Sequence, residues 1–165
     1  MSLNDKKIKE DNMGPLLDGC MPSQVAVITP DIEKSAKQFA AFFGTEVPAI
    51  STGGVYEVTK CEYMGEPAEE SGAKLAFFNL PGIQVELIEP YGGKSTWQDF
   101  LDETGGGIHH FGYQVEDIDA SMKKCEEFGF KMTQKGNYGD GSGMYVYYDA
   151  REQLNCFIEL LHSFK

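Results

Sequence analysis

The sequence predicts an α+β chain made of two tandem βαβββ modules, whose strands form a curled mixed sheet around a central cavity. Two observations predict this fold. The segment QVAVITPDIEKSAKQFAAFFG at residues 24–44 is repeated 86 positions later as HFGYQVEDIDASMKKCEEFG at residues 110–129. The ends of the copies also correspond, since GIQVELIEP at residues 82–90 matches NCFIELLHS at residues 155–163. A duplication that agrees at both ends indicates two equivalent structural units.

The order of elements is the same within each copy. An alternating apolar run predicts a first strand. The Asp-Ile segment after it favours a helix start, because the helix macrodipole stabilises negative charge there. Two further strands are expected at residues 58–64 and 73–80 in the first copy, and at residues 131–135 and 144–148 in the second. The repeated GIQVELIEP and NCFIELLHS segments supply the last strand of each.

This order divides the chain into four parts. They are a loose arm at residues 1–20, a first module at 21–91, a linker with a short helix around residues 97–101 at 92–107, and a second module at 108–165. The first residues, MSLNDKKIKEDN, lack the apolar core of a secretory signal. No apolar run approaches the length of a membrane span. We therefore expect a cytoplasmic protein that does not bind membranes.

Charge and cysteine content exclude several classes of function. The net charge is −12, and Arg151 is the only arginine. A nucleic-acid-binding protein needs a basic surface, which this composition contradicts. The four cysteines are far apart and form no CxxC pair, so we expect reduced thiols in place of a zinc or redox motif. The excess carboxylates favour solubility, and some of them are available as metal ligands.

Four polar residues occupy equivalent places in the two copies. Gln24 and His110 each open a first strand, while Glu86 and Glu159 each lie in the middle of a last strand. If a pseudo-twofold axis relates the modules, these side chains converge on one point in the cavity. One amide oxygen, one imidazole and two carboxylates suit a divalent cation such as Zn²⁺, Ni²⁺, Co²⁺, Mn²⁺ or Fe²⁺. The two carboxylates would balance its charge.

Each of these residues also has a simpler interpretation. A glutamate in an apolar strand usually faces solvent, but Glu159 shares its strand face with Phe157 and Leu161, so this strand has no polar side. A single histidine is more often structural than a ligand, although its equivalence to a residue of the other copy favours ligation by His110. His109 points to the opposite face of its strand, where we expect it behind the ligand or at the surface.

Four motifs carry a resemblance to a known family: PDIEKS, FNLPGIQVELIEP, GGGIHHFGYQVEDIDAS and FIELL. Over residues 22–162 the chain resembles the vicinal-oxygen-chelate superfamily, and within it methylmalonyl-CoA epimerase. The resemblance implies one divalent metal held by Gln24, Glu86, His110 and Glu159, and a homodimer. The epimerases usually have histidine where this chain has Gln24. Glutamine there is similar to animal glyoxalase I, which leaves the choice of metal open.

The resemblance also implies two catalytic carboxylates. A glutamate on the second strand of the epimerases acts as a base and maps onto Glu62 in KCEYMG, although the turn after it is about two residues longer here. Glu159, released from the metal, would serve the other face of the substrate. The implied reaction moves the α-proton of an acyl thioester beside a metal-polarised carbonyl.

Three other functions stay open. A glyoxalase I-like lyase would act on a glutathione adduct, and the four ligands fit it, but glutathione's carboxylates are normally bound by arginines and this chain has only Arg151. An extradiol dioxygenase needs two histidines and one carboxylate on Fe²⁺, which Gln24 does not satisfy. A metal-free drug-binding protein, similar to the bleomycin-resistance proteins, would not need the four ligands.

Overall fold

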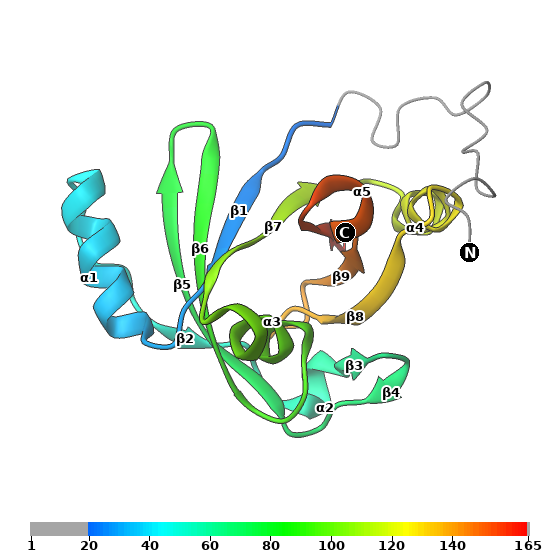
Figure 1. Cartoon of the computed structure of the whole chain (residues 1–165), viewed down its shortest axis with the longest axis horizontal. Helices are drawn as coiled ribbons and strands as arrows, with labels where there is room; N and C mark the ends of the chain where they lie inside the picture. Colours follow the sequence, from blue (N-terminus) through cyan, green and yellow to red (C-terminus); the bar gives the residue numbers. More distant parts are fainter. Residues whose placement is uncertain (1–19, 165) are drawn as a thin grey trace.

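In a computed structural model, residues 20–164 can be described, and their strands form one ten-stranded sheet in the order β2-β5-β6-β1-β7-β10-β9-β8-β3-β4 (Figure 1). The strands are β1 (Gln24–Ile28), β2 (Ser51–Thr52), β3 (Glu62–Tyr63), β4 (Glu66–Pro67), β5 (Ser71–Leu80), β6 (Ile83–Gly92), β7 (Gly107–Gln114), β8 (Lys131–Asn137), β9 (Gly143–Asp149) and β10 (Phe157–Ser163). The helices are α1 (Ile32–Phe43), α2 (Tyr56–Thr59), α3 (Thr96–Thr104), α4 (Ile118–Glu127) and α5 (Arg151–Leu154).

The two halves of the sheet have the same internal order. Counted outward from the centre, the first half runs β1-β6-β5-β2 and the second runs β7-β10-β9-β8. β1 is parallel to β6 and β7 is parallel to β10, while β1 and β7 pair antiparallel where the halves meet. The sheet is strongly curled into a half-barrel. This arrangement confirms the predicted α+β fold of two βαβββ modules.

Equivalent aspartates cap the two module helices, as the sequence predicts. Asp31 Oδ1 accepts a hydrogen bond of 3.0 Å from the backbone N–H of Lys34 at the start of α1. Asp117 Oδ1 accepts one of 2.9 Å from the backbone N–H of Ala120 at the start of α4. Each cap satisfies a backbone donor that has no partner inside the helix. The local sequence signal and the structure therefore agree in both copies.

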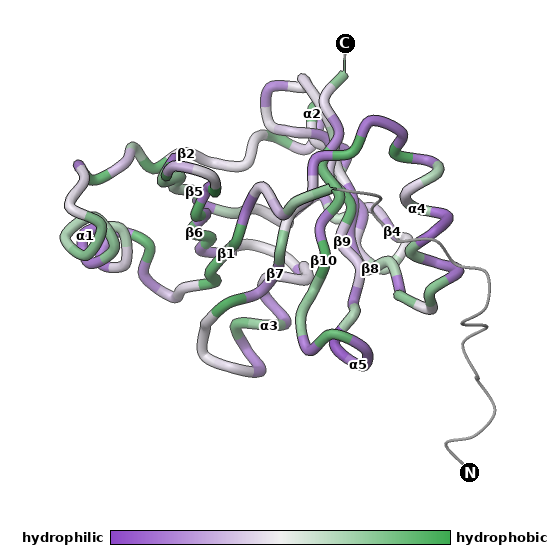
Figure 2. The backbone as a smooth tube through the Cα atoms, turned by 90° about the horizontal axis from the view of Figure 1, so that it is seen from above, coloured by the Kyte–Doolittle hydropathy of each residue, from purple (hydrophilic) through white to green (hydrophobic). Residues whose placement is uncertain are grey.

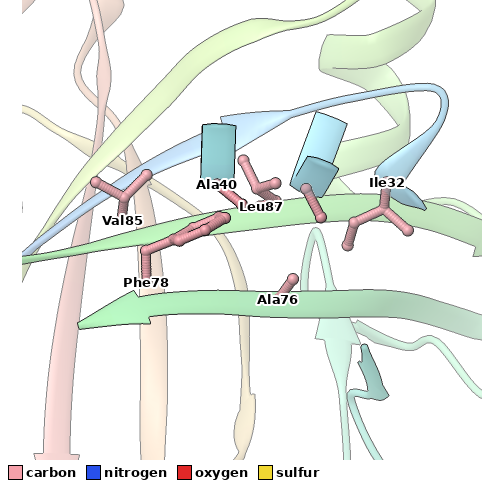
Figure 3. Close-up of a cluster of buried hydrophobic side chains, with 7 residues drawn as sticks. Ile32, Ala40, Ala76, Phe78, Val85 and Leu87 are labelled. Atoms are coloured by element: carbon pink, nitrogen blue, oxygen red, sulfur yellow. The ribbon is translucent and has the colours of Figure 1, made fainter. Parts of the chain in front are cut away.

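Each module helix covers the outer face of its own half of the sheet. α1 places Ile32, Ala36 and Ala40 against Phe78 of β5 and Leu87 of β6, and together they form a closely packed cluster (Figure 3). α4 contributes Cys125 to a second cluster on β9 and β10. These contacts leave the inner, concave face of the sheet free for a cavity, because the apolar surface of the helices is buried on the other side.

The linker helix α3 extends further than expected and joins the two halves. It begins after Ser95, whose hydroxyl accepts a hydrogen bond from the Gln98 backbone N–H, and it ends at Gly105 in the left-handed conformation. Its Trp97 packs in a third buried cluster with Ala26 of β1 and Tyr147 of β9. This cluster packs α3 against strands of both halves of the sheet.

Of the strand expected at residues 58–64, only the two-residue strand β3 (Glu62–Tyr63) forms, and it lies in the other half of the sheet. The second strand of the first module is instead β2, and the chain then turns at Gly54 (φ 101°), forms the short helix α2 and continues into the β3–β4 hairpin. β3 pairs with β8 of the second module, through Glu62 opposite Lys135. The hairpin therefore extends the edge of the other half of the sheet.

Other predictions concerned membrane spans, cysteines and the N-terminal arm. No helix among residues 20–164 is long and apolar enough to cross a membrane. All four cysteines are free thiols, and Cys61 and Cys125 are buried. Figure 2 shows mostly hydrophobic residues along the central strand β10, beside the hydrophilic turn at α5. The arm predicted at residues 1–20 lies almost wholly outside the described residues.

Candidate metal centre

Three of the predicted ligands meet at the centre of the concave face. Glu86, His110 and Glu159 come from β6, β7 and β10, and each offers a ligand atom within 4.8 Å of the others. The Nε2 atom of His110 lies 3.0 Å from Glu159 Oε2 and 3.7 Å from Glu86 Oε2. All three side chains are buried. Adjacent strands at the junction of the modules therefore bring together residues that are far apart in the sequence.

Gln24 of β1 completes the group. Its Oε1 atom lies 3.4 Å from His110 Nε2, and its side chain is buried. Its Nε2 atom donates a hydrogen bond of 2.7 Å to Gln84 Oε1, and Gln84 Nε2 donates one of 2.7 Å to Asn79 Oδ1. These bonds occupy the amide nitrogen of Gln24 and turn its oxygen toward the cluster. Gln84 was not predicted as a functional residue, although its position two before Glu86 places both on one strand face.

The second nitrogen of His110 also has a defined neighbour. His110 Nδ1 lies 2.9 Å from His109 Nδ1. If His110 Nε2 offers its lone pair to a metal, its Nδ1 carries the proton and donates to His109. Burial, and secondly the neighbouring His110, lower the pKa of His109 well below its usual range, so His109 is neutral and able to accept. His109 is fully buried and stacks on Phe157 at 4.4 Å, which places it behind the ligand.

The cluster contains two buried carboxylates, and no lysine or arginine among residues 20–164 forms an ion pair with either of them. Burial, and then the charge of Glu159, raise the pKa of Glu86 well above its usual range. The Oε2 atom of Glu159 is buried, and its 3.0 Å contact with His110 Nε2 does not count as a hydrogen bond, so this oxygen has no hydrogen-bond partner among the described residues. Buried carboxylates need a counter-charge or a proton. A donor set of two carboxylates, an imidazole nitrogen and an amide oxygen therefore fits a divalent metal ion. The role of these four residues as ligands stays a prediction.

A cavity of about 600 Å³ opens beside the cluster. Gln24, Glu86 and Glu159 form part of its lining, and Trp97, Tyr145 and Tyr147 form an aromatic wall, in which the rings of Trp97 and Tyr147 are 5.8 Å apart. Burial, and then the charges of Glu159 and Glu86, raise the pKa of Tyr147 well above its usual range. Its phenol is therefore protonated and available as a hydrogen-bond donor. A cavity of this size suits a small-molecule substrate.

The predicted base Glu62 lies elsewhere. It is on β3 at the edge of the sheet, where its Oε2 atom lies 3.3 Å from Lys135 Nζ. Its side chain is 39% exposed, and it is not among the residues that line the cavity. The structure does not bring Glu62 to the cluster, because the hairpin that carries it pairs with the outer strand β8. Its catalytic role stays a prediction.

Comparison with known proteins agrees with the fold. The sequence profile of the glyoxalase/bleomycin resistance protein/dioxygenase superfamily matches residues 23–148. The chain belongs to this superfamily. Among its curated members, the ethylmalonyl-CoA/methylmalonyl-CoA epimerase of Cereibacter sphaeroides is 32% identical over 143 residues, which cover 84% of this chain and 94% of that protein. The mitochondrial methylmalonyl-CoA epimerase of Dictyostelium discoideum is 30% identical over 61% of this chain and 52% of its own length.

Two solved structures have a similar fold. Methylmalonyl-CoA epimerase from Mycobacterium tuberculosis matches with a TM-score of 0.63 and 18% identity, over 94% of this chain and 95% of that chain. A hypothetical protein from Bacillus halodurans also matches with a TM-score of 0.63, at 17% identity over 88% of this chain and 96% of its own. At these identities the likeness shows the shared fold alone.

Proposed function

We propose that this chain is a metal-dependent enolising enzyme, similar to methylmalonyl-CoA epimerase, that moves the proton on the carbon beside a thioester carbonyl. The observation that carries the proposal is the buried group of Glu86, His110 and Glu159, with the Gln24 oxygen beside it, at the wall of a cavity. The 32% identical epimerase of Cereibacter sphaeroides supports the choice of substrate.

The chemistry follows from the low acidity of such a proton. When bound, a divalent ion supplies Lewis acidity that stabilises the negative charge developing on a carbonyl oxygen, by several kcal/mol. Gln24, Glu86, His110 and Glu159 would hold this ion. The surrounding burial excludes water and strengthens every charge interaction at the site. The protonated Tyr147 hydroxyl adds a hydrogen-bond donor in the same wall.

Epimerisation requires a proton acceptor on each face of the planar enolate. Glu159 lies at the wall of the cavity and is assigned to one face. The family resemblance assigns Glu62 to the other, although it lies outside the cavity lining in this structure. Replacement of Glu62 by Gln tests whether Glu62 is the second base. A loss of proton exchange on the order of 100-fold or more supports a base at Glu62, and unchanged exchange in a folded, metal-loaded variant contradicts it.

The proposal is tested by deuterium exchange. The metal-stripped protein is reloaded with Co²⁺ and mixed with methylmalonyl-CoA in D₂O, and loss of the α-proton is followed by NMR. We expect exchange that requires the metal and that is abolished in His110→Ala. His162→Ala is the matched control, because the Nδ1–H of His162 donates to the Val115 carbonyl oxygen and His162 is not among the residues that line the cavity. Tight Co²⁺ binding without exchange of the α-proton would contradict the choice of substrate.

A glyoxalase I-like activity is the second candidate. Gln24 favours it, because animal glyoxalase I has a glutamine at the position that Gln24 resembles. The same Co²⁺-loaded protein is assayed with the glutathione hemithioacetal of methylglyoxal. Turnover of this adduct in the absence of α-proton exchange on methylmalonyl-CoA would establish the lyase instead. Failure to bind any metal would leave a small-molecule-binding protein. The homodimer that the resemblance implies is tested separately by the molar mass in solution.

A further inference from the structure

His109 is the extra residue of a bulge in the central strand pair. Two residues of β1, Ala26 and Val27, are opposite three residues of β7, 108–110, and the pairing passes over His109. Regular alternation would direct successive side chains to opposite faces, whereas a bulge bends its strand and re-aims a side chain. The Nδ1 atoms of His109 and His110 lie 2.9 Å apart. The bulge thus places a second imidazole within hydrogen-bond distance of a predicted ligand.

The ring of His109 is held by aromatic contacts on several sides. Phe157 stacks on it, with the ring centroids 4.4 Å apart and an angle of 15° between the planes. Phe100 meets it nearly at a right angle, with the centroids 5.0 Å apart. The guanidinium of Arg151 in turn lies over the Phe157 ring, 4.7 Å from its centroid. Because His109 is also fully buried, close packing fixes the positions of its two nitrogen atoms.

These two nitrogen atoms have different surroundings. His109 Nδ1 faces His110, while His109 Nε2 is buried with no hydrogen-bond partner among the described residues. A neutral imidazole carries its proton on one nitrogen and accepts at the other. If His110 Nε2 offers its lone pair to a metal, His110 carries its proton on Nδ1, and His109 must accept it there. A buried polar atom without a partner destabilises a fold, and the service of the other nitrogen to the metal centre explains why His109 is present.

We propose that His109 is a positioning residue of the metal centre, whose Nδ1 accepts the Nδ1–H of His110 and keeps the Nε2 lone pair of His110 directed at the ion. The inference rests on the metal centre of the proposed function and not on its substrate. The usual partner of a ligating histidine is a carboxylate, a backbone carbonyl or a water molecule. A neutral imidazole adds no negative charge, so the charges of Glu86 and Glu159 alone balance a divalent ion.

The proposal is tested first by the affinity for Co²⁺, measured in competition with a chelator of known affinity. His109→Leu removes the acceptor and keeps a side chain of similar size, and we expect the affinity to fall about 10- to 100-fold. His109→Asn keeps an oxygen acceptor near the place of Nδ1, and its affinity should stay within about threefold of the wild type. An unchanged affinity in His109→Leu, or an equal loss in both variants, overturns the proposal.

Phe100→Leu is the matched control for packing. It removes a ring that contacts His109 but no hydrogen-bonding atom, and Phe100 is not among the residues that line the cavity. We expect its affinity for Co²⁺ to stay within about threefold of the wild type. A loss as large as that in His109→Leu would show that packing is responsible, and it overturns the proposal. Urea unfolding checks that each variant is folded under the conditions of the assay.

Nuclear magnetic resonance tests the direction of the hydrogen bond without any variant. In the Zn²⁺-loaded wild type, long-range ¹H–¹⁵N spectra of the imidazole rings distinguish a nitrogen that carries a proton from one that does not. We expect the proton of His110 on Nδ1 and that of His109 on Nε2. A proton on Nδ1 of His109 overturns the proposal, and this result does not depend on whether His109→Leu folds.

Failure of the inference and failure of the proposed function give different results. α-Proton exchange on methylmalonyl-CoA, together with equal Co²⁺ affinities of the wild type and His109→Leu, retains the enzyme activity and removes the role of His109. The expected order of affinities without α-proton exchange supports the role of His109 and contradicts the proposed thioester chemistry. Absence of metal binding by the wild type overturns both.

Discussion

The amide nitrogen of Gln24 donates a hydrogen bond of 2.7 Å to the side-chain oxygen of Gln84, and this bond leaves the Gln24 oxygen facing His110. The two glutamines are direct partners across the parallel pair of β1 and β6. An amide can present either its oxygen or its nitrogen to a site, and only the oxygen can bind a cation. Gln84 therefore selects the atom that Gln24 offers.

Replacement of Gln84 by Met removes this acceptor while it keeps the length of the side chain. We expect the affinity for Co²⁺ to fall about tenfold, because loss of a hydrogen bond that orients a ligand typically costs 10- to 100-fold. Isothermal titration with Co²⁺ measures the change. Gln84→Glu retains an acceptor for Gln24 and is the matched control. Unchanged affinity in Gln84→Met would show that Gln24 is oriented in another way.

The raised pKa of Glu86 should make the free energy of unfolding of the metal-free protein depend on pH. Its pKa is raised by burial and by Glu159. Between the unfolded pKa of about 4.3 and the raised folded pKa, the folded state binds more protons than the unfolded state. The free energy of unfolding therefore falls as the pH rises through this window, by at most ~1.4 kcal/mol per pH unit for one proton.

Replacement of Glu86 by Gln removes this titration. Urea unfolding of the metal-free protein at a series of pH values should show a smaller loss of stability in Glu86→Gln than in the wild type. Saturating metal should reverse the trend in the wild type, because the ion binds the ionised carboxylates. If the stability of the metal-free wild type rises between about pH 5 and 7, this account of Glu86 is wrong.

The packing of α1 on the sheet predicts a large effect of one apolar deletion. Leu87 is fully buried in the cluster with Ile32 and Ala36. We expect Leu87→Ala to lower the free energy of unfolding by about 2–5 kcal/mol, because it removes apolar contacts and leaves a cavity. Phe42→Ala is the control, since Phe42 lies on the same helix but is 85% exposed. Thermal or urea unfolding of both variants measures the difference.

The two helix caps predict matched losses of stability. Asp31→Ala and Asp117→Ala each remove a side-chain hydrogen bond to the first turn of a module helix. Each should cost about 1 kcal/mol of unfolding free energy. The double variant should lose the sum, because the two caps share no partner. Asp31→Asn and Asp117→Asn, which keep an oxygen acceptor, should be close to the wild type. A cap whose loss changes nothing would not contribute to stability.

The internal repeat explains why much of this protein was predictable. Gln24 and His110 occupy equivalent positions in the two copies, as do Glu86 and Glu159. The structure places all four at the junction of β1 and β7. Alternation of side chains along a strand then puts them on one face. The positions of these four residues could therefore be predicted from strand patterns that occur in both copies of the repeat.

Other features depend on contacts between distant parts of the chain. The hairpin that carries Glu62 pairs with the strand of Lys135 in the second module, although the local pattern predicted an ordinary strand of the first. The hydrogen bond between Gln24 and Gln84 requires the register of two strands and a particular side-chain torsion. No local pattern specifies either of these.

The sequence by itself predicted the two-module α+β fold, the starts of the two module helices, and the four polar residues that come together in the structure. The tertiary structure alone decided that His109 lies buried behind His110, that Gln84 orients Gln24, and that the cavity lining lacks a described cation. The physical reason is that the formation of single helices and strands follows from residues close in sequence. The surroundings of a buried side chain are set by packing among residues that are far apart in the chain.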